Sequence, residues 1–185
     1  MIKLIGNDIH RFAIKLWKFN RSITGQGLRE TLEQIKLHLP ELKIKSVPTG
    51  TNAFDWTVPR EWSVNEAYII TPSGDRICDF SVNNLHLLGY SVPFEGELHL
   101  LDLKKHLYTV SEQPDAIPYV TSYYRERWGF CLTQNQYDNL EEGKYYVKVD
   151  TKLFDGFLNY AELIITGKTS KEVLISTYVC HPSMA

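Results

Sequence analysis

The run Val173–Val179 constrains the fold of this chain more than any other feature. It is rich in β-branched residues and carries no charge, which is typical of a strand that is buried on both faces of a sheet. A sheet of that kind needs helices on both sides, because both of its faces are apolar. We therefore expect an α/β fold in which this run is a central strand.

The front of the chain predicts two amphipathic helices between about residues 7 and 39, because apolar residues recur there at three- and four-residue spacing. The first pattern is formed by Ile9, Phe12, Ala13, Leu16 and Trp17, and the second by Leu28, Leu32, Ile35 and Leu39. Pro40 ends the second helix. The back of the chain adds strand-like runs at Lys144–Val149 and Leu158–Ile165.

Two helices and three strands leave one face of the predicted sheet bare. We therefore expect the chain to be the front part of a larger α/β protein whose further helices cover that face. Packing of the bare face against a second copy, which would give a homo-oligomer, is the alternative.

The middle of the chain has a different character, with many Trp, Tyr, Pro and Gly residues between short strand-like runs. Glu66–Thr71 and Arg76–Phe80 flank the turn residues Pro72–Asp75 and predict a hairpin. Short helices are expected at Leu98–Leu107 and Gln134–Leu140. We predict a compact β-rich module at residues 56–140, inserted into a discontinuous α/β domain made of residues 1–55 and 141–185.

Composition and charge exclude several classes of protein. The formal net charge of −2, without a basic stripe, argues against a nucleic-acid partner. No stretch approaches the ~20 apolar residues of a membrane span. The three cysteines, Cys78, Cys131 and Cys180, form no C-x-x-C pair and are interpreted as free thiols in a reducing compartment. We expect a soluble, cytoplasmic protein.

Several stretches, in order along the chain, are similar to one known family. Ile175–Ala185 resembles the first metal-ligand strand of an aminopeptidase-like family within the co-catalytic zinc exopeptidases. Phe54–Pro59, Asn84–Ser91, Ile117–Tyr124 and Trp128–Cys131 resemble the same family. Its members are often labelled polysaccharide-biosynthesis proteins with an aminopeptidase-like domain. The resemblance implies a partial zinc-exopeptidase-like α/β core interrupted by a β-rich module of unassigned function.

The resemblance also implies a site. Carried over by position, His181 would ligate one zinc ion, and the substrate would be a peptide or amino-acyl compound. The bridging carboxylate, the general-base Glu and the other ligands are expected beyond residue 185, so we predict that these 185 residues alone are inactive. Ser183 stands where many relatives place an Asp that orients the histidine, which puts the strength of the metal site in doubt.

Other candidate residues have simpler interpretations. Cys180 is interpreted as a packed thiol, since no motif places a base beside it. The spacings of His86, His99 and His106 match no standard metal site. Asp55, Glu66 and Asp79 would suit glycoside chemistry only if two of them lay close together, and solvated turn residues are the simpler interpretation.

The middle region contains an aromatic set with two interpretations. The set comprises Trp56, Trp62, Tyr90, Tyr119, Tyr123, Tyr124, Trp128 and Phe130. Most members are expected in the core of the small module, which needs large residues to bury enough area, and a minority would line a sugar- or peptide-binding surface. Arg125–Arg127 is interpreted as a solvated turn, with neutralisation of a substrate carboxylate as the alternative.

Two functions follow from the sequence. The first is the N-terminal part of a zinc-dependent aminopeptidase-like hydrolase, in which the module shapes substrate access or oligomer contacts. The alternative is a non-catalytic binding or structural module of a glycan-biosynthesis-associated protein, toward which Ser183 leans.

Overall fold

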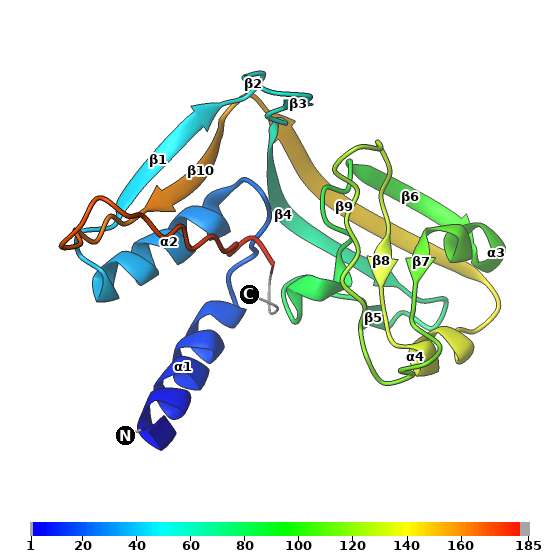
Figure 1. Ribbon diagram of the computed structural model, residues 1–185. Coiled ribbons are helices and arrows are strands. Elements are labelled where there is room, and N and C mark those ends of the chain that lie inside the picture. The colour runs from blue at the N-terminus through cyan, green and yellow to red at the C-terminus, as the bar shows by residue number, and fades with distance from the viewer. Residues whose placement is uncertain (1, 182–185) are drawn as a thin grey trace. The chain divides into compact units, whose positions relative to one another are not determined.

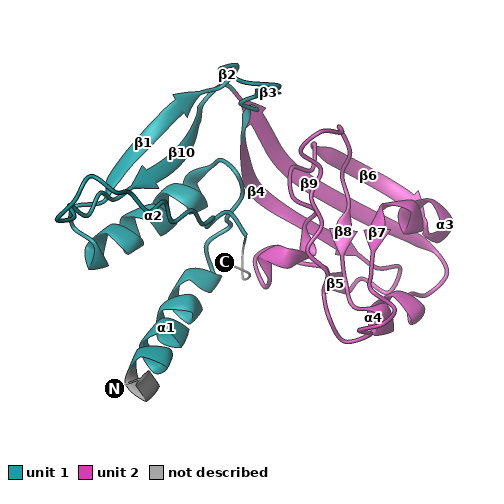
Figure 2. Cartoon of the chain, viewed as in Figure 1, with its two compact units in different colours: residues 1–61, 155–185 teal, residues 62–154 magenta. Residues whose placement is uncertain are grey.

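The computed structural model describes residues 2–181, and the chain divides into two compact units (Figure 2). The discontinuous unit comprises Met1–Glu61 and Asp155–Ala185, and the continuous unit comprises Trp62–Phe154. These boundaries differ from the predicted ones at 55/56 and 140/141, because the structure assigns the long strand β9 (Lys144–Phe154) to the continuous unit. Whether the continuous unit interrupts a peptidase-like core stays a prediction.

Within residues 2–181, the discontinuous unit contains two helices and four strands (Figure 1). They are α1 (Ile2–Trp17), α2 (Gln26–His38), β1 (Lys43–Pro48), β2 (Asn52–Ala53), β3 (Trp56–Thr57) and β10 (Phe157–Glu162). β1 and β10 pair antiparallel, from Lys43 opposite Glu162 to Pro48 opposite Phe157. Both predicted helices are confirmed, and α2 packs near β10.

The core of the discontinuous unit is small. It is formed by Leu16, Leu28, Leu32, Leu42 and Val58, which are all less than 10% exposed. Of the predicted apolar face of α2, Leu28 and Leu32 are buried, whereas Ile35 is partly exposed and Leu39, just beyond the helix, is 42% exposed. Within residues 2–181, no helix combines the length and the apolar character that a membrane span requires.

A partly buried ion pair joins α2 to Glu61, the last residue of the first segment of this unit. Arg29 Nη2 lies 2.5 Å from Glu61 Oε1, and the Glu61 side chain is only 5% exposed. The other oxygen of Glu61 accepts a hydrogen bond from the Phe157 backbone N–H at 3.1 Å. Gly156 is required beside it, since a Cβ at that position would lie 2.4 Å from Glu61 Oε2. Glu61 therefore holds α2 and the start of β10 together.

The state of Glu61 predicts how stability depends on pH. Burial alone would raise the pKa of Glu61, but the hydrogen bonds from Arg29 and Phe157 and the charge of Arg29 outweigh it, so the pKa lies below its ordinary value of 4.5. The unfolded chain then binds a proton at higher pH than the folded chain. The stabilisation by Glu61 is complete above pH 4.5 and is lost as the pH falls through the folded pKa.

We expect urea denaturation between about pH 3 and 7 to show a steeper loss of stability with acid in the wild type than in Glu61→Gln. Carboxylates elsewhere titrate in both proteins, so they cancel in the difference. Parallel stability curves for the two proteins would contradict this assignment.

The continuous unit is built on a four-stranded sheet in the order β5-β4-β9-β6. Its strands are β4 (Glu61–Ile70), β5 (Arg76–Ile77), β6 (Phe94–His99) and β9, and a small parallel pair is formed by β7 (Leu107–Tyr108) and β8 (Phe130–Cys131). Short helical elements are η1 (Asn84–His86), α3 (Leu100–Leu103), η2 (Lys104–His106) and α4 (Gln134–Asp138). The antiparallel β4–β5 pair confirms the predicted hairpin.

Strand β9 shows how the sequence places the core of this unit. Tyr145, Val147 and Val149 are at most 2% exposed, and the residues between them are not buried, which is the period-two pattern of a half-buried strand. Phe130, from β8, is fully buried as well. The Ser91 carbonyl links β4 to β9, because it accepts hydrogen bonds from Trp62 Nε1 in β4 and from the Thr151 hydroxyl in β9.

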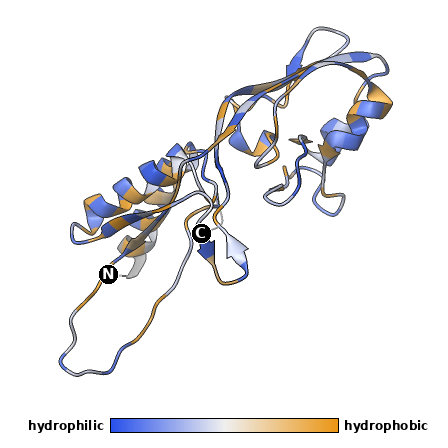
Figure 3. Cartoon of the chain, turned by 90° about the horizontal axis from the view of Figure 1, so that it is seen from above, coloured by the Kyte–Doolittle hydropathy of each residue, from blue (hydrophilic) through white to orange (hydrophobic). Residues whose placement is uncertain are grey.

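The prediction that Val173–Val179 is a central strand is wrong in this structure. The segment has no regular secondary structure, and Val173, Leu174 and Ile175 are 87–91% exposed. Figure 3 shows hydrophobic residues along the extended stretch that leads to the C-terminal end. A β-branched run indicates only a preference for extended backbone. It becomes a strand only where another strand supplies its hydrogen-bond partners. No strand within residues 2–181 pairs with this segment.

Candidate functional site

His181, the predicted metal ligand, lies at the end of the described chain. It is partly buried, and its ring centroid is 5.1 Å from that of Tyr178. The neighbouring Cys180 is also partly buried, and burial raises the pKa of its thiol. A protonated thiol is a poor nucleophile, which agrees with the interpretation of Cys180 as a packed residue. Ser183 lies outside the described residues.

The described residues do not form a metal site around His181. Within residues 2–181, no three or more His, Cys, Asp or Glu side chains come together in a way that would hold an ion. A catalytic zinc needs about three protein ligands, so one imidazole does not fit the ion by itself. The assignment of His181 to zinc therefore stays a prediction.

Two of the three histidines of the middle region are held by local contacts. His86 is buried, and its Nδ1 lies 2.8 Å from the Cys131 carbonyl oxygen. His106 stacks on Trp128 with ring centroids 3.8 Å apart, and its Nδ1 lies 3.1 Å from the Trp128 carbonyl. His99 is exposed and immediately precedes α3.

The candidate carboxylates have different surroundings. Asp79 pairs with Arg76 at 2.6 Å, and Glu66 pairs with Lys148 at 3.4 Å. Asp55 is exposed in the turn between β2 and β3. The interpretation as a solvated turn residue holds for Asp55, whereas it is wrong for Glu66, which lies within β4, and for Asp79, whose side chain is only 16% exposed.

Half of the aromatic set lies in the core. Trp62, Tyr90, Trp128 and Phe130 are less than 10% exposed. Trp56, Tyr119 and Tyr123 are partly exposed, and Tyr124 is 80% exposed. The interpretation as core residues is therefore confirmed for four of the eight members, not for most of them.

The interpretation of Arg125–Arg127 as a wholly solvated turn is wrong for Arg127. Its guanidinium donates to the Ser122 hydroxyl and the Thr121 carbonyl, both at 3.0 Å. Those bonds tie the turn to the preceding segment, while Arg125 and Glu126 are exposed as expected.

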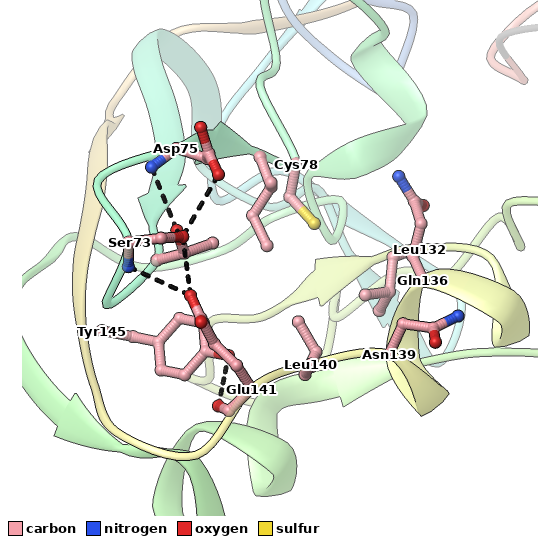
Figure 4. A pocket seen from close by; sticks show the side chains of 11 residues that line it. Ser73, Asp75, Cys78, Leu132, Gln136, Asn139, Leu140, Glu141 and Tyr145 are labelled. Atoms are coloured by element: carbon pink, nitrogen blue, oxygen red, sulfur yellow. Dashed lines mark hydrogen bonds between the residues drawn. The ribbon is translucent and has the colours of Figure 1, made fainter.

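A pocket that the sequence did not predict lies between β5 and α4, and we call it the β5–α4 pocket. It encloses about 360 Å³. Its polar rim is formed by Ser73, Asp75, Gln136, Asn139 and Glu141, which are all exposed. Figure 4 shows the two carboxylates on one side of the pocket and the two amides on the other. Its volume falls within the ~300–1,000 Å³ range of small-molecule sites.

Ser73 fixes the two carboxylates of the rim. Its backbone N–H donates to Glu141 Oε1 at 3.0 Å, and its hydroxyl lies 2.7 Å from the same oxygen and 3.1 Å from Asp75 Oδ2. The side-chain and backbone hydrogen bonds from Ser73 lower the pKa of Glu141. Glu141 is therefore a charged group at neutral pH, held in one orientation.

The floor of the pocket is apolar. It is formed by Ile77, Cys78, Leu132, Leu140 and the ring of Tyr145. Burial raises the pKa of Cys78 to about 12, so its thiol stays protonated and acts as part of the apolar surface. The only sequence signal for the pocket was the polar turn Pro72–Asp75, which looks the same as any solvated hairpin turn.

This chain matches one family model and is similar to a protein of known sequence. A family model described as a domain of unknown function (DUF2172) matches residues 61–152. A protein from Clostridium acetobutylicum, provisionally named polysaccharide biosynthesis protein with aminopeptidase-like domain, is 46% identical over 179 residues. That match covers 97% of this chain and 41% of the relative.

A solved structure is similar to this chain over the same share of its length. The crystal structure of a protein provisionally described as a peptidase, also from Clostridium acetobutylicum, superimposes with a TM-score of 0.91 at 46% identity. The match covers 97% of this chain and 42% of the solved chain. The chain thus spans about two fifths of the length of these relatives.

Proposed function

We propose that this chain, which matches a domain of unknown function (DUF2172) and is similar to a polysaccharide biosynthesis protein with an aminopeptidase-like domain, contributes to a zinc-dependent aminopeptidase-like hydrolase. The observation that carries the proposal is the match to a peptidase-like relative over 97% of the chain, at a TM-score of 0.91. The substrate would be a peptide or amino-acyl compound with a free amino terminus.

In this proposal His181 is one zinc ligand, and the other ligands lie in the part of the relatives that this chain does not match. Bound zinc would supply a Lewis acid and a water of lowered pKa. By itself His181 does not complete a site, so the 185 residues are expected to be inactive.

The test is a chimera in which this chain replaces the matched portion of the Clostridium acetobutylicum relative. We expect the 185 residues alone to release no amino acid from aminoacyl p-nitroanilides with added zinc. The chimera is expected to release it, and His181→Ala in the chimera is expected to lower activity by at least about 100-fold, because a catalytic ion loses a ligand.

The matched control is His99→Ala in the same chimera, since His99 is exposed and belongs to the continuous unit. It is expected to leave both activity and zinc content unchanged. Full activity and full zinc content in the His181→Ala chimera would contradict the assignment of this ligand. Hydrolysis by the 185 residues alone would contradict their predicted inactivity.

A non-catalytic role in glycan biosynthesis is the second candidate, favoured by Ser183 at the place where many members of the wider superfamily have an orienting Asp. The name of the relative, which mentions polysaccharide biosynthesis, supports it too. A chimera that is folded and holds zinc but hydrolyses no aminoacyl or peptide substrate would favour this role over catalysis.

A further inference from the structure

The β5–α4 pocket is a site that the proposed hydrolase does not use. All of its lining residues belong to the continuous unit and lie within residues 61–152, which match the domain of unknown function. His181 belongs to the other unit. A role for the pocket is therefore independent of the proposed function, and each can fail without the other.

The charge of the pocket limits what it can bind. Its lining includes two carboxylates, Asp75 and Glu141, and no Lys, Arg or His. An anion such as a phosphate would be repelled by both carboxylates and would meet no compensating cation. The chemistry favours a ligand that is neutral or positively charged.

The hydrogen-bonding groups of the β5–α4 pocket limit the kind of ligand further. Glu141 Oε1 accepts from the Ser73 backbone N–H, and the single proton of the Ser73 hydroxyl is donated either to the same oxygen or to Asp75 Oδ2. The second oxygen of each carboxylate accepts no hydrogen bond from residues 2–181, so it remains available to a ligand. Carboxylates held in this way can accept from two neighbouring hydroxyl groups, and the amides of Gln136 and Asn139 lie across the opening (Figure 4).

The apolar floor calls for a ligand with a second, nonpolar face. Ile77 and Leu140, which are partly exposed, present carbon atoms beneath a rim of carboxylates and amides, while Leu132 and Tyr145 are fully buried. A pyranose ring has this combination, because its hydroxyl groups project from the edge while its C–H groups form a flat apolar face. A volume of about 360 Å³ suits a single ring rather than a long chain.

We propose that the β5–α4 pocket binds one monosaccharide ring, either neutral or bearing an amino group. Asp75 and Glu141 accept hydrogen bonds from adjacent hydroxyl or ammonium groups. Gln136 and Asn139 contact the opposite edge of the ring, and the C–H face packs on Ile77 and Leu140.

The first test is an NMR titration of the 185-residue protein with glucose, galactose, mannose, glucosamine and N-acetylglucosamine. At least one sugar is expected to shift the backbone amide signals of Ser73, Asp75 and Asn139 in a saturable manner. The 6-phosphate of that sugar is expected to bind at least about tenfold more weakly, owing to charge repulsion. Ethanolamine, which has an ammonium group but no ring, is the matched probe for simple cation binding.

The second test uses variants that keep side-chain volume. Glu141→Gln and Asp75→Asn are each expected to weaken the sugar about tenfold, the usual cost of losing a hydrogen bond to a charged group. Glu142→Gln is the control, because Glu142 is an exposed neighbour that does not line the pocket. Its affinity should stay within about twofold of the wild type.

Three results would overturn the proposal. These are failure of every sugar to bind, binding of ethanolamine as tight as that of the sugar, and unchanged sugar affinity in both variants. The dispersion of the amide spectrum reports whether each variant is folded. If one variant unfolds, the other still decides the question.

Discussion

Replacing Phe130 with alanine is expected to lower the free energy of unfolding of the continuous unit by about 3–5 kcal/mol. Phe130 is fully buried in β8, and its ring meets the edge of Trp128. Truncation removes the transfer free energy of the ring and leaves a cavity in packed surroundings. Domains of this size are stable by only about 5–15 kcal/mol, so a large share of the stability would be lost.

The measurement is urea denaturation followed by amide hydrogen exchange, which reports stability residue by residue. Exchange protection is expected to fall at Tyr145, Val147 and Val149 of β9. The matched control is Phe54→Ala, since Phe54 is a fully exposed residue of the same type. Its substitution is expected to change stability by less than about 0.5 kcal/mol. An equal loss in both variants would show that Phe130 is not a core residue.

Replacing Glu61 with alanine is expected to cost the discontinuous unit about 3 kcal/mol. Loss of one partner of a buried ion pair typically costs about 3–5 kcal/mol, because the other charge is stranded. The lower end applies here, since the Arg29 side chain is 33% exposed and water screens it. The Phe157 backbone N–H also loses its acceptor.

The double variant Arg29→Met with Glu61→Met isolates the cost of leaving the Arg29 charge without its partner. It removes both charges, so it is expected to be more stable than Glu61→Ala. Glu162→Ala provides a surface control, because the Lys45–Glu162 pair is open to water on both sides and little change is expected. A double variant that is no more stable than the single one would show that the stranded charge is not the cause.

Local patterns in the sequence predicted the local elements well. The leucine and isoleucine spacing of α2 and the turn Pro72–Asp75 both depend on contacts within a few residues, so their signals are complete in the sequence. Val173–Val179 shows what a local sequence pattern does not predict. Its composition favours extended backbone, but a strand also needs a neighbour, and the described chain pairs none with it.

The candidate sites were harder to predict for a related reason, since they depend on residues that lie far apart in the sequence. His181 was found only through a family resemblance, since a lone histidine after an apolar run is no metal signal by itself. The β5–α4 pocket was missed because its rim comes from two stretches, around residues 73–75 and 136–141, that are polar and exposed. Each stretch alone looks like an ordinary solvated turn, and only tertiary folding makes them face one another.

The pairing of β1 with β10 has a consequence for the order in which the chain folds. To form it, residues 43–48 must meet residues 157–162, and the whole of Trp62–Phe154 lies in the loop that this closes. Closing a flexible loop costs about 0.6 kcal/mol more with each doubling of its length. Once the continuous unit is compact, the effective loop is far shorter. The strands of the discontinuous unit therefore pair at least cost after the segment between them has folded, which makes the central segment the natural starting point of assembly.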